Sequence, residues 1–499
     1  MRILFGSLLV GMTLSGVAAP DGELIERDWR MRDGIDTPRE SVTWHEAIEK
    51  VVAAGDRLVA DLARREVDLG TLGVEWDECR QLCKILQPTA AAGEWEQLWR
   101  RVHTVRRRIV FADPVVTRDP LLFVKQVPST FSHQLTQYYG RLGRPGGGVF
   151  VLEAPGESLH CRQLGAGRLP PGSFQHPELS FDGRRVLFAY CALDPARTKV
   201  ESGYQITEGA CYHLYEIGID GTGLRQVTEG PFDDFAPVYL PSGKIMFSST
   251  RRGGFHRCGR GPCPVYTLAS VESDGSSPRV LSFHETHEWD PALLNDGRVI
   301  YTRWDYVDRD AVYYQQLWTS NPDGSAPAEY FGNYMRNPVG IWEARPIPGS
   351  SGIMATAAAH HAMTAGSIIK VDVTRGQNTL DAITRLTPEV PFPESESPVM
   401  RGEGDTGGWR AVAGLMEDRP LPREAKRWPG HCYRSPYPLS ETTFLAAYSY
   451  DPLIGEPGAN KANMFGLYIV DRFGNRELLY RDPDISSLWP IPVRPRPVQ

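Results

Sequence analysis

Several short motifs that identify enzymes on their own are missing from this sequence of 499 residues. There is no Cys-x-x-Cys-His motif, which excludes covalent attachment of a c-type haem to this chain. No Ser-His-Asp order or nucleotide fingerprint stands out. The glycine-rich stretch GRPGGGVF (143–150) precedes a predicted strand, whereas a phosphate loop opens a helix. The sequence therefore has no self-contained catalytic motif, and it leaves open whether the protein is an enzyme.

A net positive charge is absent, and long hydrophobic runs are scarce. The net charge is -7, which argues against a nucleic-acid partner. The first 19 residues combine a basic residue, an apolar run and small residues at the end, which is typical of a secretory signal peptide. A retained membrane anchor is the alternative, but the run is short for a span and is broken by Gly and Ser. We expect cleavage of residues 1–19, no transmembrane segment in the mature chain, and a periplasmic or extracellular location.

Cysteine is sparse, with eight residues, but export makes each of them a candidate for a disulfide. Cys258 and Cys263 bracket the tight loop CGRGPC, and we expect them to be bonded. A metal site that includes His256 is the alternative, because zinc sites usually separate paired cysteines by two to four residues. Cys191 and Cys211 are a second expected pair, because they flank strands that we expect to be neighbours.

A repeated register of proline and glycine organises most of the chain. In each copy a proline stands six residues before a turn position, and an apolar strand follows the turn. The pairs are Pro177 and Gly183, Pro237 and Gly243, Pro291 and Gly297, Pro346 and Gly352, and Pro436 with Thr442 in place of glycine. Proline is tolerated where a strand needs no backbone donor, and glycine supplies the positive φ of a hairpin turn.

Each copy has a second hairpin, so one unit contains four strands. The second turns are at 220–221, 274–275, 323–324 and 474–475. Four-stranded units at this spacing predict a β-propeller. We count six blades, the first using 119–126 and 146–155 and the others beginning near the repeat prolines. The predicted fold is therefore mainly β, a six-bladed propeller over residues 118–485.

A helical region is predicted ahead of the propeller, over residues 20–117. Thr43 and Glu46 form a capping box, and the apolar residues that follow recur at helical spacing. Two more helices are expected near 75–86 and 93–110.

Two further segments have unusual compositions. The basic stretch RVHTVRRRIVF (101–111) predicts a solvated helix face, with a site for an anionic partner as the alternative. The end of the chain, WPIPVRPRPVQ, is rich in proline, and we expect residues 486–499 to form an extended tail outside the propeller.

The stretch HETHEWDP (284–291) is similar to a zinc-protease motif, but its spacing excludes that function. The protease motif places two histidines four residues apart on a helix. Here His284 and His287 are three apart, and Pro291 follows almost at once. We expect a polar loop that leads into a strand. The adjacent His360 and His361 would face opposite sides if their segment is a strand.

Polar side chains stand just before several repeat prolines. In a propeller the loops that lead into the innermost strands gather around the axis on one face, so these residues should cluster. The candidates for binding a ligand or partner are Asp233, Asp234, His287, Glu288, Asp290, Trp342, Glu343, Arg345 and His431, and His176 has the same register. The candidates for binding zinc or calcium are His284, His287, His431 and Cys432. Hydrogen bonding between neighbouring blades is the alternative role, and the spacing does not decide between them.

Long phrases of the repeat region resemble a known family. STRRGGFHRCGRGPCPVYTL, LWTSNPDGS and FGLYIVDRFGNRELLYRDPDIS are similar to the middle domain of the hydrazine synthase alpha subunit, and the array is similar to TolB-type propellers. The resemblance covers residues 118–497 and implies a propeller fold. Members of that family act in a multihaem complex that makes hydrazine from nitric oxide and ammonium. Because this chain has no haem-attachment motif, the resemblance does not imply hydrazine synthesis by this chain alone.

Two functions follow as hypotheses. The first is an exported propeller scaffold that binds a ligand or a protein partner, with a haem or redox protein as the candidate partner. The second is a metal-dependent or haem-associated redox enzyme with its site at the mouth of the propeller channel.

Overall fold

The computed structural model describes most of the chain. The described residues are 19–37, 42–87, 89–129, 131–196, 209–255, 263–305, 314–333, 335, 337–393, 429–456 and 458–498. The expected signal peptide lies outside them, apart from residue 19, and so do His256 and Cys258. Among the described helices, none combines the length and the hydrophobicity needed to cross a membrane.

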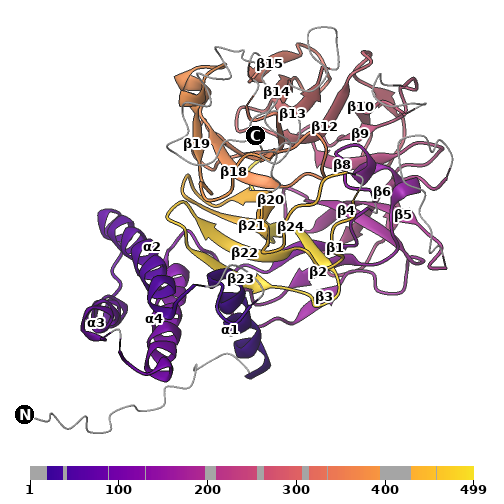
Figure 1. Ribbon diagram of the computed structural model, residues 1–499. Helices are drawn as coiled ribbons and strands as arrows, with labels where there is room; N and C mark the ends of the chain where they lie inside the picture. Colours follow the sequence, from indigo (N-terminus) through magenta and orange to yellow (C-terminus); the bar gives the residue numbers. More distant parts are fainter. Residues whose placement is uncertain are drawn as a thin grey trace, which may run out of the picture.

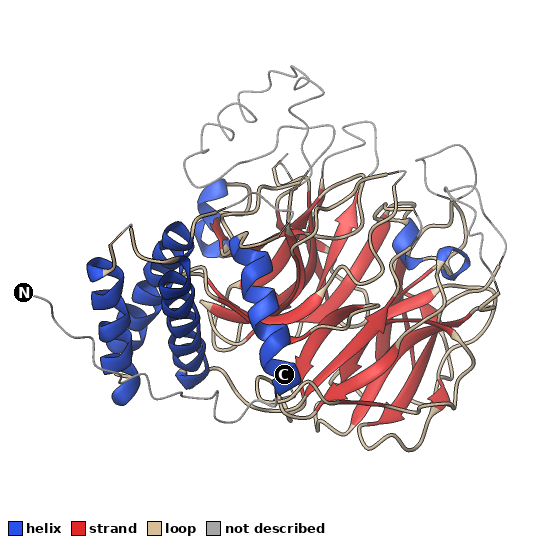
Figure 2. Cartoon of the chain, turned by 60° about the horizontal axis from the view of Figure 1, so that its bottom comes forward, coloured by secondary structure: helices blue, strands red, loops and turns tan. Residues whose placement is uncertain are grey.

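Sheets grouped around a common centre make up most of the molecule, and four helices lie to one side of them (Figure 1). The helices are α1 (Ala19–Asp33), α2 (Trp44–Arg64), α3 (Thr71–Ile85) and α4 (Ala92–Ala112). In Figure 2 a group of helices stands beside the strands, and another helix lies across the front of them. The predicted capping box is present, because the Thr43 side chain accepts from the Glu46 amide and Glu46 accepts from the Thr43 amide.

The strands form three sheets of four strands and one sheet of twelve, and neighbours within each run of four are antiparallel. The first sheet has the order β24 (Ser486–Pro492), β1 (Leu121–Gln126), β2 (Gly148–Leu152) and β3 (Cys161–Gln163). The second contains β4 (Gly172–Leu179), β5 (Arg185–Ala192), β6 (His213–Gly218) and β7 (Arg225–Gln226). The third contains β8 (Asp234–Tyr239), β9 (Ile245–Ser249), β10 (Thr267–Val271) and β11 (Arg279–Val280).

The twelve-stranded sheet consists of three runs of four strands. These are β12 (His287–Leu293), β13 (Val299–Trp304), β14 (Gln315–Ser320) and β15 (Ala328–Phe331); β16 (Gly340–Pro346), β17 (Ile353–Ala358), β18 (Gly366–Val371) and β19 (Ile383–Arg385); and β20 (Cys432–Pro438), β21 (Thr443–Ser449), β22 (Gly466–Asp471) and β23 (Arg476–Tyr480). Single residue pairs join the runs, Gln315 with Gly340 and Gly366 with Tyr433. The fold is therefore mainly β and of the propeller type.

The two ends of the β region meet in the first sheet. Strand β24 pairs with β1, with Leu121 opposite Pro492 and Val124 opposite Leu488. Every residue of β24 is buried. We expected this segment to be a proline-rich tail outside the propeller, but it contains the strand of the first sheet that lies nearest the centre of the molecule. Strand β1 is therefore the second strand of that sheet rather than the first.

A β-bulge recurs in the strands nearest the centre, β4, β8, β12, β16, β20 and β24. One residue in each bulge has a left-handed backbone: His176 (φ 50°), Ala236 (49°), Asp290 (50°), Glu343 (55°), Ser435 (53°) and Trp489 (54°). Proline follows five of them, since a bulge needs no ladder donor there. In β16 the following residue is Ala344, so the fourth repeat is not aligned on Pro346 as the sequence register suggested.

The expected disulfide between Cys191 and Cys211 is not formed. The register of β5 and β6 pairs Tyr190 with His213, so Cys191 faces the position of Tyr212 and Cys211 is directed to the opposite face. Gly140 also lies between them, because a Cβ there would be 2.8 Å from the Cys191 sulfur and 2.9 Å from the carbonyl carbon of Cys211. The expected pair of Cys258 and Cys263 falls partly outside the described residues.

The helices dock on the outer strand β23 through a buried carboxylate. Glu477 is fully buried and accepts hydrogen bonds from the indole of Trp29 (3.2 Å), from Arg106 (2.5 Å) and from Arg107 (3.2 Å). The basic stretch 101–111 was expected to be a solvated face, but Arg106 and Arg107 point inward and neutralise this acid.

The lowered pKa of Glu477 predicts that the stability of the protein depends on pH. Burial opposes its ionisation, but the charges of Arg106, Arg107 and Arg32 lower the pKa of Glu477 to about 2. A carboxylate whose pKa is depressed by folding stabilises the protein above its unfolded pKa of 4.5, and that stability is lost as the pH falls toward about 2. The loss amounts to about 3 kcal/mol. Urea unfolding from pH 7 to pH 2 should show it as a difference between the wild-type chain and a Glu477→Gln variant, which lacks this titration.

Candidate functional site

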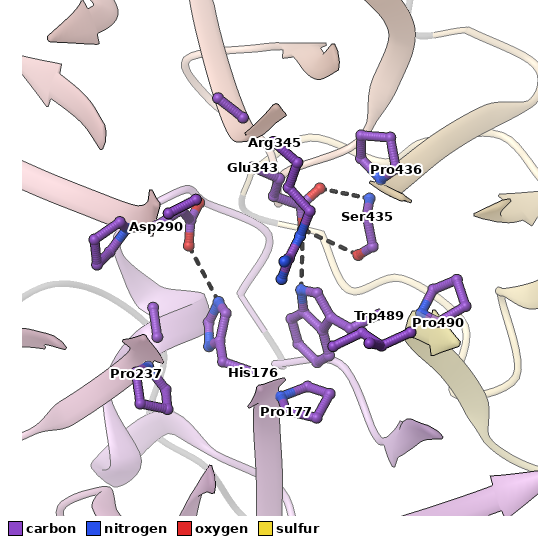
Figure 3. A pocket seen from close by; sticks show the side chains of 15 residues that line it. His176, Pro177, Pro237, Asp290, Glu343, Arg345, Ser435, Pro436, Trp489 and Pro490 are labelled. Carbon is purple, nitrogen blue, oxygen red and sulfur yellow. Dashed lines mark hydrogen bonds and ion pairs between the residues drawn. The ribbon is translucent and has the colours of Figure 1, made fainter. Parts of the chain in front are cut away.

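A pocket lies at the centre of the sheets, where the bulges of the innermost strands meet (Figure 3). It encloses about 490 Å³ of space, its opening included. Its polar lining consists of His176, Asp290, Glu343, Arg345, Ser435 and Trp489, and its apolar lining includes Pro177, Pro237, Pro291, Pro436 and Pro490. The left-handed residues therefore present their side chains at one common place, although they come from strands far apart in the sequence.

Glu343 is the most strongly held group in this pocket. Its carboxylate accepts hydrogen bonds from the Ser435 amide (2.5 Å) and hydroxyl (3.0 Å), from Arg434 (3.1 Å), from the Trp489 indole (3.2 Å) and from Thr356 (2.9 Å). Burial opposes ionisation, but the charge of Arg434 and these hydrogen bonds lower the pKa of Glu343. Because both carboxylate oxygens of Glu343 already accept hydrogen bonds from the protein, its role is to hold one wall of the pocket in place.

Asp290 and His176 form the opposite wall. The His176 Nε2 atom lies 3.2 Å from Asp290 Oδ1, and both side chains are more than nine-tenths buried. Neither carboxylate oxygen of Asp290 has a hydrogen-bond donor of suitable geometry among the described residues. The His176 ring packs at a tilt against Trp489 (4.7 Å between centroids) and against Tyr138 (5.2 Å). Asp290 thus faces the pocket, and His176 is its ion-pair partner.

Arg345 supplies a positive charge at the same pocket. Its guanidinium is 3.5 Å from Glu178, and it lies over the ring of Tyr437. Glu178 also accepts from Arg496, so the Arg345 charge is only partly neutralised. The side chain of Arg345 is 24% exposed, which leaves it accessible to a bound molecule.

The other acidic candidates bind protein groups. Asp233 accepts from the amides of Gly140 (2.8 Å) and Tyr212 (3.0 Å), and burial raises its pKa to about 6. Asp234 binds Arg251 (2.7 Å) and the Ser249 hydroxyl (2.6 Å). Glu288 accepts from the Leu268 amide (3.0 Å), which belongs to the neighbouring sheet. The contacts of Glu288 join one sheet to the next, those of Asp234 lie within one sheet, and all three carboxylates are occupied.

The candidates for metal binding are dispersed. His284 binds Glu288 (2.7 Å), the His287 ring accepts from the Tyr266 amide (3.2 Å), and His431 contacts the hydroxyl of Tyr448 (3.5 Å). Burial raises the pKa of the Cys432 thiol. Within the described part of the chain these four residues do not form a group of donors for one ion.

Two tryptophans of the central strands have packing roles. The candidate Trp342 is fully buried, and its ring is 6.2 Å from that of Trp289. Trp289 also stacks on His287, with 5.0 Å between centroids. Trp289 therefore packs among the innermost strands rather than facing the pocket.

Sequence reasoning missed a group of donors outside the repeat register. Among the described residues, one set of three or more donors could hold a metal ion, and it consists of His133, His360 and His361. The adjacent histidines were the only signal in the sequence. The expectation that they face apart does not apply, because β17 ends at Ala358 and the pair lies in the turn that follows.

Comparison with known proteins gives a likeness of fold. No protein-family model and no curated protein matches the chain. Among solved structures, hydrazine synthase of Kuenenia stuttgartiensis is similar at 16% identity and a TM-score of 0.53, over 76% of this chain and 47% of that one. TolB of Acinetobacter baumannii (11% identity, TM-score 0.39, 79% and 72% covered) and an oligogalacturonate lyase of Vibrio parahaemolyticus (11%, 0.31, 55% and 80%) are also found. The chain thus spans about half of the hydrazine synthase chain and shares its fold over that region.

Proposed function

We propose that this protein is a six-bladed β-propeller that serves as a binding scaffold and takes a small polar ligand in its axial pocket. The six-blade count is supported by the contacts of the innermost strands, in which β4, β8, β12, β16, β20 and β24 touch in that order and β24 touches β4. Each of these strands begins a run of four. Export and a protein partner, with a haem or redox protein as one candidate, are further parts of this proposal.

The state of Asp290 is the observation that carries the ligand proposal. Asp290 is a buried carboxylate whose contact with His176 lacks hydrogen-bond geometry, and a buried acceptor in that state costs free energy that a ligand donor would offset. Asp290 also has a left-handed backbone, which costs a residue other than glycine about 1–2 kcal/mol. Unfavourable groups of this kind are concentrated at functional sites.

The charges of the pocket indicate the class of ligand. Asp290 accepts hydrogen bonds, and Arg345 donates them in a geometry that suits a carboxylate. A small zwitterion with an ammonium for Asp290 and a carboxylate for Arg345 fits these two groups, and free amino acids are its simplest examples.

An Asp290→Asn variant tests this proposal in two ways. Asparagine adopts the left-handed backbone readily and removes the unsatisfied charge, so the ligand-free variant should gain about 1 kcal/mol of stability. Binding of an amino acid should weaken about tenfold or more, because a hydrogen bond to a charged group is lost. Thermal unfolding measures the first effect. Calorimetric titration with a panel of free amino acids measures the second, with ethanolamine and acetate as probes that carry one group each.

A matched control is Asp323→Asn, in an exposed turn where Asp323 accepts from the Ser325 amide. It should change neither binding nor stability by more than about 0.5 kcal/mol. Two outcomes would count against the proposal: a loss of stability in Asp290→Asn of 2 kcal/mol or more, or the absence of heat and of thermal shift with every amino acid tested.

A further inference from the structure

Three loops bring histidines and a glutamate together away from the axial pocket. We propose that His133, His360, His361 and Glu456 form a binding site for a divalent transition metal, with zinc as the physiological ion. One ring nitrogen from each histidine lies within 4.8 Å of the others. Glu456 completes the group, with Oε1 3.0 Å from His361 Nδ1 and Oε2 3.7 Å from His133 Nε2. Three imidazoles and one carboxylate or water are a common donor set for zinc.

The loops that carry these donors are fixed to one another through Ser132. Its amide donates to the Gly458 carbonyl (2.9 Å), and its hydroxyl accepts from the Met363 amide (3.0 Å) and from Asn460 (2.9 Å). The Glu456 amide donates to the His361 carbonyl (2.9 Å). The backbone of the site is therefore built before any ion binds, as the second shell of a metal centre requires.

The distances allow coordination after a small adjustment of side chains. Tetrahedral bonds of about 2.0–2.1 Å place ligand nitrogens roughly 3.4 Å apart, so ring nitrogens that lie up to 4.8 Å apart must approach by up to about 1.4 Å. The Leu135 amide donates to His133 Nδ1 at 3.1 Å and directs Nε2 toward Glu456. Coordination through Nε2 places the ring proton on Nδ1, so the hydrogen bond from the Leu135 amide is lost and the His133 ring must turn away from that amide.

Access and surroundings also suit a metal centre. The side chains of His133 and His360 are buried, whereas those of His361 and Glu456 are 21% and 23% exposed, so an ion and a water ligand can reach the site. Beside the site is a second cavity of about 350 Å³, lined by Ser132 and Met363. Trp489 lines that cavity and the axial pocket as well. The metal site is separate from the axial pocket, and its proposal does not rest on ligand binding there.

Zinc titration of the purified full chain, after chelator treatment and dialysis, tests the proposal. We expect one zinc per chain in competition with a chromophoric chelator, and visible absorption when cobalt(II) takes its place. Loss of a second-shell partner costs about 10–100-fold in metal affinity, so removal of a ligand in His361→Ala should cost at least about 100-fold. Glu456→Gln should also weaken binding. His160→Ala, at an exposed histidine, should leave zinc binding unchanged.

Thermal unfolding in the presence of chelator checks that each variant is folded. If His133→Ala does not fold, the partly exposed His361 and Glu456 provide the test by themselves. The proposal is overturned if the wild-type chain binds no zinc. It is equally overturned if a His361→Ala/Glu456→Gln double variant keeps one zinc at wild-type affinity, since the ion is then held elsewhere, for example by thiols.

Discussion

Replacing Glu477 with glutamine is expected to destabilise the protein by about 3–5 kcal/mol. The substitution keeps the size of the side chain but removes the charge that neutralises Arg106 and Arg107, and both guanidiniums are buried with it. The new amide group also directs a donor at groups that are themselves donors. Urea unfolding followed by the fluorescence of the tryptophans of the chain measures the effect.

Glu78→Gln is the matched control. Glu78 pairs with Arg101 on the same helical layer, but the two side chains are 54% and 43% exposed. An exposed ion pair contributes no more than about 1 kcal/mol, so this variant should unfold at nearly the wild-type urea concentration. Equal stability losses in the two variants would contradict the view that the buried carboxylate holds the helices on the sheets.

Deletion of residues 486–499 is expected to abolish cooperative folding. It removes β24, leaves the buried strand β1 as an open edge, and takes Trp489 away from His176 and Glu343. Deletion of residues 497–499 is the control, because it spares β24 and the contacts of Arg496 with Glu178 and Leu179. Soluble yield and circular dichroism on heating compare the two. A long deletion that melts sharply near the wild-type temperature would show that β24 is dispensable.

The repeat could be predicted because its signals are local. Gly183, Gly243 and Gly297 all have positive φ in the hairpin turns where the sequence placed them, and the prolines before them mark the innermost strands. The last strand could not be found in the same way. Pro490 and Pro492 argue against a strand by local rules, but Pro490 lies in a bulge and Pro492 is the final residue of β24. The partner of this strand lies at the other end of the propeller, where no local pattern points to it.

Only part of the candidate site could be predicted from the sequence, for a related reason. Asp290 and Glu343 lie in the bulges and line the pocket, and both were among the candidates predicted from the sequence near the repeat prolines. Asp233 and His287 each stand three residues before the left-handed residue of the bulge. Their side chains accept hydrogen bonds from backbone amides, that of Tyr212 for Asp233 and that of Tyr266 for His287. The donors His133, His360 and Glu456 come from loops of unrelated lengths, and only the packing of those loops reveals that they meet.

The docking of the helices on β23 has a consequence for how the protein is made. Helices α1–α4 are synthesised first and β23 is among the last elements to be made. The helices therefore lack their contact with Glu477 during almost the whole of synthesis. During that interval two buried arginines and the apolar face around Trp29 and Trp99 have no partner from the sheets. Nascent chains with such exposed surfaces are prone to aggregation. The order of the elements along the chain therefore leaves this helical surface uncovered until β23 is made.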